Sequence, residues 1–225
     1  DRFAKSASYT PPTQRKDIIR REWGDVPYHT PEQFGGEYLA NDFFGGSLAG
    51  IIEKLPYLAD LGVTVLYLNP IFEAYSNHRY DTGDYETIDP MLGDEKLFSQ
   101  LCAQARSLGI RIILDGVFNH TGSNSKYFNK NGVYPTVGAH QSKDSPFYDW
   151  YDFSAWPDAY ASWWGIKTLP HVKAMTPSYL DYILTGGDAI IKKWVRLGAS
   201  GWRLDVVDEL PDEFIEKVRT AVKRV

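Results

Sequence analysis

The chain has 225 residues, of which 43% are hydrophobic and 24% charged, an ordinary composition for a globular protein with a substantial core. Its 24 basic and 29 acidic side chains give a net charge of −5, which argues against nucleic acid or an anionic membrane as the main partner. The single cysteine, Cys102, excludes an intrachain disulfide framework, and the sequence has no run of about 18 apolar residues that would predict a membrane span. These observations leave the cellular compartment open.

Three helix-then-strand units are predicted from residue 48 onward. Apolar residues recur at helical spacing over 48–62, 95–109 and 189–200. Each of these segments leads into a short, nearly continuous apolar run: VTVLYLNPIF at 63–72, RIILDGVFNH at 111–120 and GWRLDVV at 201–207. The stretch 211–225 has the helical pattern again and predicts a further helix. Strands that are apolar on both faces are covered by helices, so the pattern predicts a parallel α/β sheet, either a (β/α) barrel or an open doubly wound sheet.

Two connections are longer than the others. Residues 70–93 follow the first strand and contain SNHRYDTGDYETIDP, and residues 121 to about 180 follow the second. Long loops in a compact domain are usually functional, and in a parallel barrel they leave the carboxyl ends of the strands, where active sites lie. Aromatic residues gather in 127–164, where they fit a small loop core as well as a surface that stacks on sugar rings.

Polar side chains accompany each predicted strand at the end where these loops begin. The set consists of His78, Tyr80 and Asp81 in the first loop, Asp115, Asn119 and His120 at the second strand, and Arg203 and Asp205 at the third. Residues two apart in a strand share a face, so Arg203 and Asp205 point the same way. Two inward charges carry a desolvation penalty unless they pair or act on a ligand, and their joint occurrence with the other polar groups predicts a functional site at one rim.

The motifs DGVFNH, GWRLDVVDE and SNHRYDTGDYETIDP resemble the conserved regions of the α-amylase superfamily, glycoside hydrolase family 13, and especially its neopullulanase, cyclomaltodextrinase and amylopullulanase members. The stretches FFGGSLAGIIEKLPYLADLGVTVLYLNPIF, LPHVK and the leading DRF extend the resemblance over nearly the whole chain. The resemblance implies a partial (β/α)8 TIM barrel in which strands 2 to 4 are recognisable and the first strand is missing. Residues 1–120 are then the N-terminal part of the barrel, 121–180 an inserted domain B, and 181–225 the continuation through strand 4 and its following helix.

The resemblance also implies an enzyme, a retaining hydrolase of α-1,4 glucosidic bonds in starch, pullulan or cyclodextrins, with action on α-1,6 bonds left open. Asp205 is then the nucleophile that forms a covalent glycosyl intermediate, and Arg203 keeps it ionised by pairing with it. His120 is expected to donate a hydrogen bond to the sugar and Tyr80 to stack beneath it. Further substrate contacts are expected from His78, Trp163, Trp164 and Glu209, and structural roles at the strand end and loops from Asp115, Asn119 and Asp81.

The chain departs from the family pattern in two respects. Retaining hydrolysis requires a second carboxylic acid about 5 to 5.5 Å from the nucleophile. In the family this acid is a glutamate after the fifth barrel strand, whereas this sequence ends in the helix after the fourth. We therefore expect the chain alone to have negligible hydrolytic activity, and to pair with the remainder of the barrel or to self-associate.

The second departure concerns calcium. The resemblance requires no cofactor, but calcium is an open expectation, because some relatives bind it through a DRFANGD-like segment and an FGGD turn, where this chain has DRFAKSAS and FFGGS. In the second motif Ser47 stands where those relatives have a carboxylate. The resemblance implies Asn119 as the candidate ligand, because family members often use that asparagine in a calcium site or as a loop anchor.

Two alternative functions remain open at this point. An α-glucan transglycosylase shares every motif named above. A non-catalytic carbohydrate-binding module with an amylase-like fold is the other, although the presence of both Arg203 and Asp205 argues against loss of catalysis. A doubly wound nucleotide-binding protein is excluded, because no glycine-rich phosphate loop occurs in the sequence.

Overall fold

A three-stranded parallel sheet organises the fold. The computed structural model describes residues 1–11, 17–28, 40–223 and 225. The strands are β3 (Val65–Tyr67), β6 (Arg111–Gly116) and β9 (Gly201–Leu204), in the order β3-β6-β9. Their register aligns Asp115 of β6 with Arg203 of β9. The carboxyl ends of the strands that carry the polar residues therefore meet at one edge.

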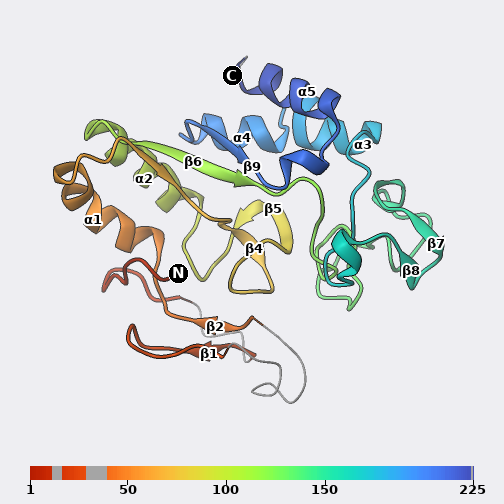
Figure 1. Ribbon diagram of the computed structural model, residues 1–225, viewed down its shortest axis with the longest axis horizontal. Coiled ribbons are helices and arrows are strands. Elements are labelled where there is room, and N and C mark those ends of the chain that lie inside the picture. The colour runs from red at the N-terminus through yellow and green to blue at the C-terminus, as the bar shows by residue number, and fades with distance from the viewer. Residues whose placement is uncertain (12–16, 29–39, 224) are drawn as a thin grey trace.

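Four helices of the predicted units surround this sheet (Figure 1). They are α1 (Leu48–Asp60), α2 (Glu95–Ser107), α4 (Ile190–Arg196) and α5 (Asp212–Val222). Ser47 and Asp94 cap the first two helices by accepting hydrogen bonds from Gly50 N–H and Leu97 N–H, at 3.2 and 2.7 Å. A further helix, α3 (Pro177–Leu180), continues as the π-helical turn η4 (Asp181–Thr185) and was not predicted. It extends across residue 180, so the predicted end of the inserted domain falls inside a continuous helical segment.

The core forms where the helices pack on the sheet, and it is rich in aromatic rings. Trp194 of α4 is fully buried, lies 5.0 Å from the ring of Phe72 and 5.5 Å from that of Phe98, and donates its indole N–H to the carbonyl of Tyr85 at 2.9 Å. An indole is buried at low cost only when its N–H is satisfied, and this bond satisfies it. Trp194 therefore fixes α4 against both α2 and the segment that follows β3.

The segment 70–93 is not the irregular loop that the sequence indicated. It contains two antiparallel strands, β4 (Phe72–Ala74) and β5 (Thr82–Ile88). Tyr85 and Ile88 of β5 are buried in the core, which gives this hairpin an apolar anchor that the polar motif SNHRYDTGD concealed. At the N-terminal end, β1 (Ile19–Arg20) pairs in parallel with β2 (Asp42–Phe43).

The long insertion after β6 lies beyond the carboxyl end of that strand, at the right of Figure 1. It contains the antiparallel pair β7 (Phe153–Ala155) and β8 (Ala159–Tyr160) and the short 3-10 turns η2 (Tyr148–Trp150) and η3 (Trp163–Gly165). Phe128 is its centre, with ring contacts to Tyr151, Phe153 and Tyr160 at 4.7 to 5.8 Å. Most of the aromatic cluster is therefore a small core, as one of the two sequence interpretations held.

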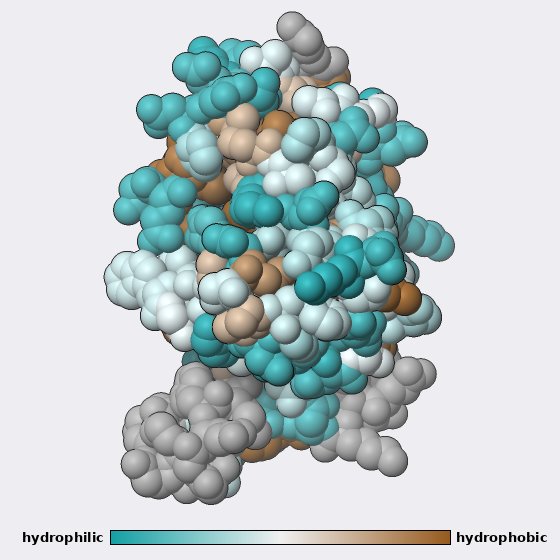
Figure 2. Space-filling model, turned by 90° about the vertical axis from the view of Figure 1, so that its right-hand side faces the viewer, coloured by the Kyte–Doolittle hydropathy of each residue, from teal (hydrophilic) through white to brown (hydrophobic). Residues whose placement is uncertain are grey.

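The surface at this end is formed mainly by polar residues, with small separate apolar areas between them (Figure 2). In the part of the chain that the structure describes, no helix has the length and apolarity needed to cross a membrane.

Candidate active site

One guanidinium joins the two aspartates at the carboxyl end of the sheet. Nη1 of Arg203 donates to both carboxylate oxygens of Asp115 at 3.0 Å and to Oδ1 of Asp205 at 2.6 Å. Asp205 follows β9 directly, and its backbone N–H donates to the carbonyl of Gly116 at 3.1 Å. The strand register thus brings three charged groups from two neighbouring strands together, and the predicted contact between Arg203 and Asp205 is present.

Burial sets the electrostatics of this cluster. The side chain of Asp115 is completely buried and that of Asp205 is 12% exposed, while that of Arg203 is 43% exposed. Burial acts to lower the pKa of Arg203, but its hydrogen bonds to the two aspartates and the charge of Asp115 outweigh burial and raise this pKa. For Asp115, burial raises the pKa, and hydrogen bonds from Tyr67 and Arg203 act against that rise. Arg203 is therefore a permanent cation that offsets the charge of two buried carboxylates.

Two tyrosines complete the hydrogen bonding of Asp115. Tyr80 Oη donates to Oδ2 of Asp115 at 3.0 Å, and Tyr67 Oη donates to the same oxygen. Tyr67 was not among the predicted site residues. Its signal in the sequence was an aromatic residue that alternates with Leu66, so that the two side chains lie on opposite faces of β3. Asp115 is thus the centre of a four-residue network with Arg203, and not merely an anchor of a strand end.

His120 lies in the loop after β6 and is buried. Burial, with a smaller contribution from the neighbouring His171, lowers the pKa of His120 to about 4. Its Nδ1 is 3.5 Å from the amide nitrogen of Asn119, while its Nε2 has no hydrogen-bond partner among the described residues. The imidazole is therefore neutral at neutral pH, and its Nε2 is a buried nitrogen without a hydrogen-bond partner among the described residues.

The inserted segment reaches this rim through two adjacent tryptophans. Trp163 and Trp164 stack on each other with ring centroids 5.2 Å apart, and Trp163 lies 5.4 Å from the ring of His120. Both indole N–H groups donate to Oε1 of Glu209, at 3.3 and 2.9 Å. Glu209 belongs to the 3-10 turn η5 (Val207–Glu209), so the structure joins these four predicted substrate-contact residues in one cluster.

The remaining predicted residues lie in the loop between β4 and β5. His78 Nδ1 accepts a hydrogen bond from the Tyr80 backbone N–H at 3.1 Å. The carboxylate of Asp81 accepts from the backbone N–H of Ser76 at 3.1 Å and also from the hydroxyl of that serine. These bonds shape the loop, and they place His78 beside Tyr80 with a distance of 6.0 Å between ring centroids.

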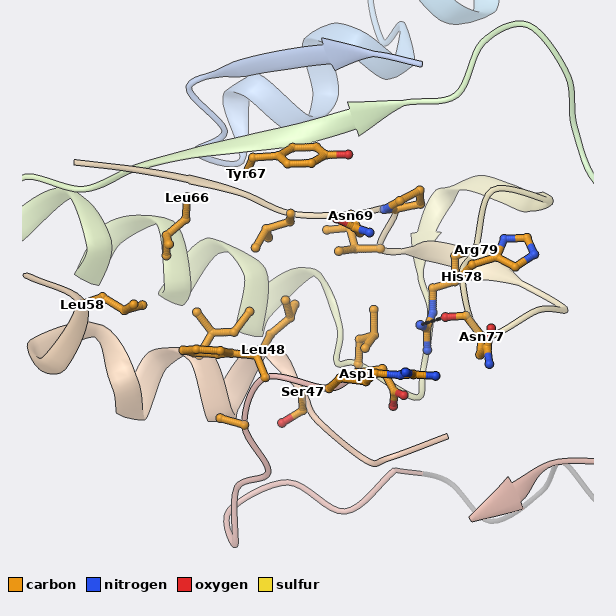
Figure 3. Close-up of a pocket in the computed structure, with 18 residues that line it drawn as sticks. Asp1, Ser47, Leu48, Leu58, Leu66, Tyr67, Asn69, Asn77, His78 and Arg79 are labelled. Atoms are coloured by element: carbon orange, nitrogen blue, oxygen red, sulfur yellow. Dashed lines mark hydrogen bonds between the residues drawn. The ribbon is translucent and has the colours of Figure 1, made fainter. Parts of the chain in front are cut away.

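A pocket of about 560 Å³ lies between β3 and α1, as Figure 3 shows. Leu48 and Leu58 line it from the helix and Leu66 from the strand, and Asp1 and Arg79 lie toward one end (Figure 3). Its lining is largely aliphatic, whereas a sugar needs several hydrogen-bonding groups around an apolar face. We therefore place the candidate active site at the carboxylate cluster, and interpret the pocket as a groove beside the sheet.

The residues near Asn119 give little support for calcium. Among the described residues, no group of three or more His, Cys, Asp and Glu side chains is arranged to hold a metal ion. The Asn119 amide nitrogen lies 3.5 Å from Oε2 of Glu209, where the amide donates and the carboxylate accepts. Calcium binding stays a prediction.

The family profile for the alpha-amylase catalytic domain matches residues 1–223. The chain belongs to the α-amylase family. This α-amylase-family chain is 44% identical to an amylopullulanase of Thermoanaerobacterium saccharolyticum over 92% of its own length and 18% of that relative.

Solved structures agree with this assignment. A crystal structure of a protein from Thermus thermophilus superposes with a TM-score of 0.82 at 37% identity, covering 100% of this chain and 44% of that one. Cyclic α-maltosyl-(1→6)-maltose hydrolase of Arthrobacter globiformis, in complex with the saccharide in its name, superposes with a TM-score of 0.77 at 33% identity, covering 99% of this chain and 46% of the other. The predicted family and the predicted fold class, part of a TIM barrel, are confirmed. The chain spans less than half of the length of each of these three relatives.

Proposed function

We propose that the chain forms the nucleophile-bearing part of a retaining α-glucan hydrolase that cleaves α-1,4 glucosidic bonds. The observation that carries the proposal is the guanidinium of Arg203 bonded at once to Asp115 and Asp205 on a rim shared with His120. The names of the relatives, which include amylopullulanase, intracellular maltogenic amylase and cyclomaltodextrinase, support α-glucans as the substrate class. Starch, pullulan and cyclodextrins are the substrates to test, and α-1,6 bonds are the alternative linkage.

In this proposal, Asp205 attacks the anomeric carbon of the glucosyl unit. The carbon forms a bond to the Asp205 carboxylate oxygen as the glycosidic bond breaks, and the leaving oxygen takes a proton from a second carboxylic acid. Water then attacks the same carbon, gives its proton to that second residue and releases Asp205. Arg203 supports this role because its guanidinium donates a 2.6 Å hydrogen bond to Oδ1 of Asp205 and so holds the carboxylate at the rim.

The groups around Asp205 suit the binding of a sugar ring. The Nε2 of His120 is buried and has no hydrogen-bond partner among the described residues, and we propose that it bonds a hydroxyl of the glucosyl unit. Tyr80 and His78 lie side by side and provide ring faces below that unit. Trp163 and Trp164 provide further stacking area on the insertion side of the rim.

Glu209 is not suited to be the second acid. Its Oε1 accepts two indole N–H bonds and its Oε2 lies within reach of the Asn119 amide, so both oxygens act as acceptors. A general acid must instead carry a proton toward the leaving oxygen. We therefore propose that the acid comes from another part of the barrel and that the 225-residue chain alone does not turn over glucans.

Complementation tests this proposal. The chain would be assayed with maltoheptaose alone and after co-expression with the part of the Arthrobacter globiformis enzyme that it does not match. We expect cleavage only in the co-expressed pair, and loss of more than about 1,000-fold of that activity in Asp205→Asn, because the nucleophile is removed. Normal turnover by the isolated chain, or unchanged activity of Asp205→Asn, would refute it. Longer oligosaccharides formed with excess acceptor sugar would show transfer in place of hydrolysis.

The exposed edge of the sheet supports a partner for the chain. Val65 and Tyr67 of the outer strand β3 are 38% and 42% exposed, and Tyr67 also lines the groove of Figure 3. An uncovered parallel edge is a template for further strand pairing. We propose that this edge pairs with the remainder of a barrel. Light scattering after size exclusion distinguishes pairing with the remainder of a barrel from self-association. Self-association would give a dimer or larger species that persists when the other segment is co-expressed.

A further inference from the structure

Glu209 makes a contact that the catalytic proposal does not use. Its carboxylate receives the indole N–H groups of Trp163 and Trp164, which lie about 45 residues earlier in the chain, inside the insertion. Glu209 itself lies four residues after the proposed nucleophile Asp205. The contact therefore ties the insertion to the turn that leaves the reacting strand.

Trp164 has little else to hold it in place. The residue is 80% exposed, and its backbone adopts the left-handed conformation with φ of +49°. A bulky residue in that region costs about 1 kcal/mol or more, so other interactions must stabilise it. The interactions present are the stack on Trp163 and the 2.9 Å bond to Glu209. A bond from N–H to a charged carboxylate is among the stronger hydrogen bonds in proteins.

The Glu209 carboxylate also accepts the indole N–H of Trp163. Trp163 lies between Trp164 and the imidazole of His120, with interplanar angles of 23° and 30°. The three rings form a continuous stack from the buried rim to the exposed face of Trp164. The second oxygen of Glu209 is 3.5 Å from the amide of Asn119, the residue before His120. Glu209 therefore contacts both the outer end of the stack and the loop that carries its inner end.

We propose that Glu209 is a positioning residue that fixes Trp163 and Trp164 as one rigid platform, whose outer face receives the apolar face of a glucosyl unit. The glucan part of this inference rests on the proposed function. The positioning part is independent of it, because it concerns only the orientation of the two indoles. An exposed tryptophan that is already ordered loses less side-chain entropy when a sugar stacks on it.

Circular dichroism of the chain tests the positioning. Trp163 and Trp164 are the one tryptophan pair in ring contact within the described ranges. The difference between the spectra of wild type and Trp164→Phe therefore gives the exciton signal of this pair. We expect Glu209→Ala to remove the same signal and to raise acrylamide quenching of tryptophan fluorescence. Glu209→Gln, which keeps an acceptor oxygen, should retain most of the signal. The matched control is Asp208→Ala, the exposed neighbouring carboxylate, which should leave the spectrum unchanged.

Titration with maltoheptaose tests the platform. Removing a stacking surface of this kind weakens binding about tenfold, so we expect that loss in Trp164→Ala and a similar loss in Glu209→Ala. A full exciton signal in Glu209→Ala, or its loss in Glu209→Gln, would overturn the positioning role. Unchanged affinity of Glu209→Ala despite a lost signal would overturn the platform role. If the unmodified chain fails to bind maltoheptaose, the glucan assignment fails, whereas the spectra still decide whether Glu209 orders the indoles.

Discussion

Replacing Arg203 by methionine isolates the contribution of the guanidinium to the carboxylate cluster. The methionine keeps an apolar side chain of similar reach, so that the change mainly removes the charge and the three hydrogen bonds to Asp115 and Asp205. Asp115, whose side chain is completely buried, is then left beside a second carboxylate without a counter-charge.

The expected loss of stability follows from burial. Removing one partner of a fully buried ion pair costs about 3 to 5 kcal/mol because the other charge stays buried. Since 43% of the Arg203 side chain is exposed, water screens part of this interaction, and we expect about 2 kcal/mol at pH 7. The control is Arg196→Met, whose ion pair with Asp188 is long, at 3.6 Å, and exposed on both sides. That variant should lose less than about 1 kcal/mol.

The loss should also depend on pH. Burial already raises the pKa of Asp115, and Arg203 opposes this rise. Without the guanidinium the folded-state pKa rises further above the unfolded value, so the folded variant takes up a proton as the pH falls. The destabilisation measured at pH 7 should therefore diminish toward pH 4. Urea unfolding of wild type and both variants at the two pH values is the assay. A loss no greater than that of Arg196→Met, or one that is equal at both pH values, would refute the reasoning.

Burial lowers the pKa of His120 from 6.5 in the unfolded chain to about 4 in the fold, so the unfolded state takes up a proton first as the pH falls. The free energy of unfolding should therefore decrease by about 3 kcal/mol between pH 6.5 and pH 4. Urea unfolding should show a weaker dependence of stability on pH in His120→Gln. Trp194→Ala should lower the free energy of unfolding by about 3 to 5 kcal/mol because it opens a cavity in the core, whereas Trp23→Ala, at a residue 71% exposed, should change it by less than about 0.5 kcal/mol. Gly50→Ala should lower the melting temperature although alanine favours helices, because its Cβ would lie 2.0 Å from a backbone carbonyl oxygen; Gly24→Ala, which has open space, should leave the melting temperature unchanged.

Several features of the fold follow directly from local sequence patterns. The predicted helices at 48–62 and 95–109 are present as α1 and α2, and the apolar runs that follow them contain β3 and β6. The hairpin of β4 and β5 was missed because charged and polar residues interrupt its short strands. It forms because Tyr85 and Ile88 find a core that other segments supply.

The sequence alone determined that Arg203 and Asp205 share a face, because side chains in a strand alternate, and it placed the motifs of the family in order along the chain. Only the tertiary structure decided that Arg203 also bonds Asp115 on the neighbouring strand, since this contact depends on the register of β6 and β9. The bond between Trp164 and Glu209 likewise depends on the path of the insertion back to the rim. The physical reason is that the alternation of side chains in a strand and the spacing of apolar residues in a helix are set within a few residues. The register of two strands and the path of a long loop are instead fixed by packing between segments that are distant in the sequence.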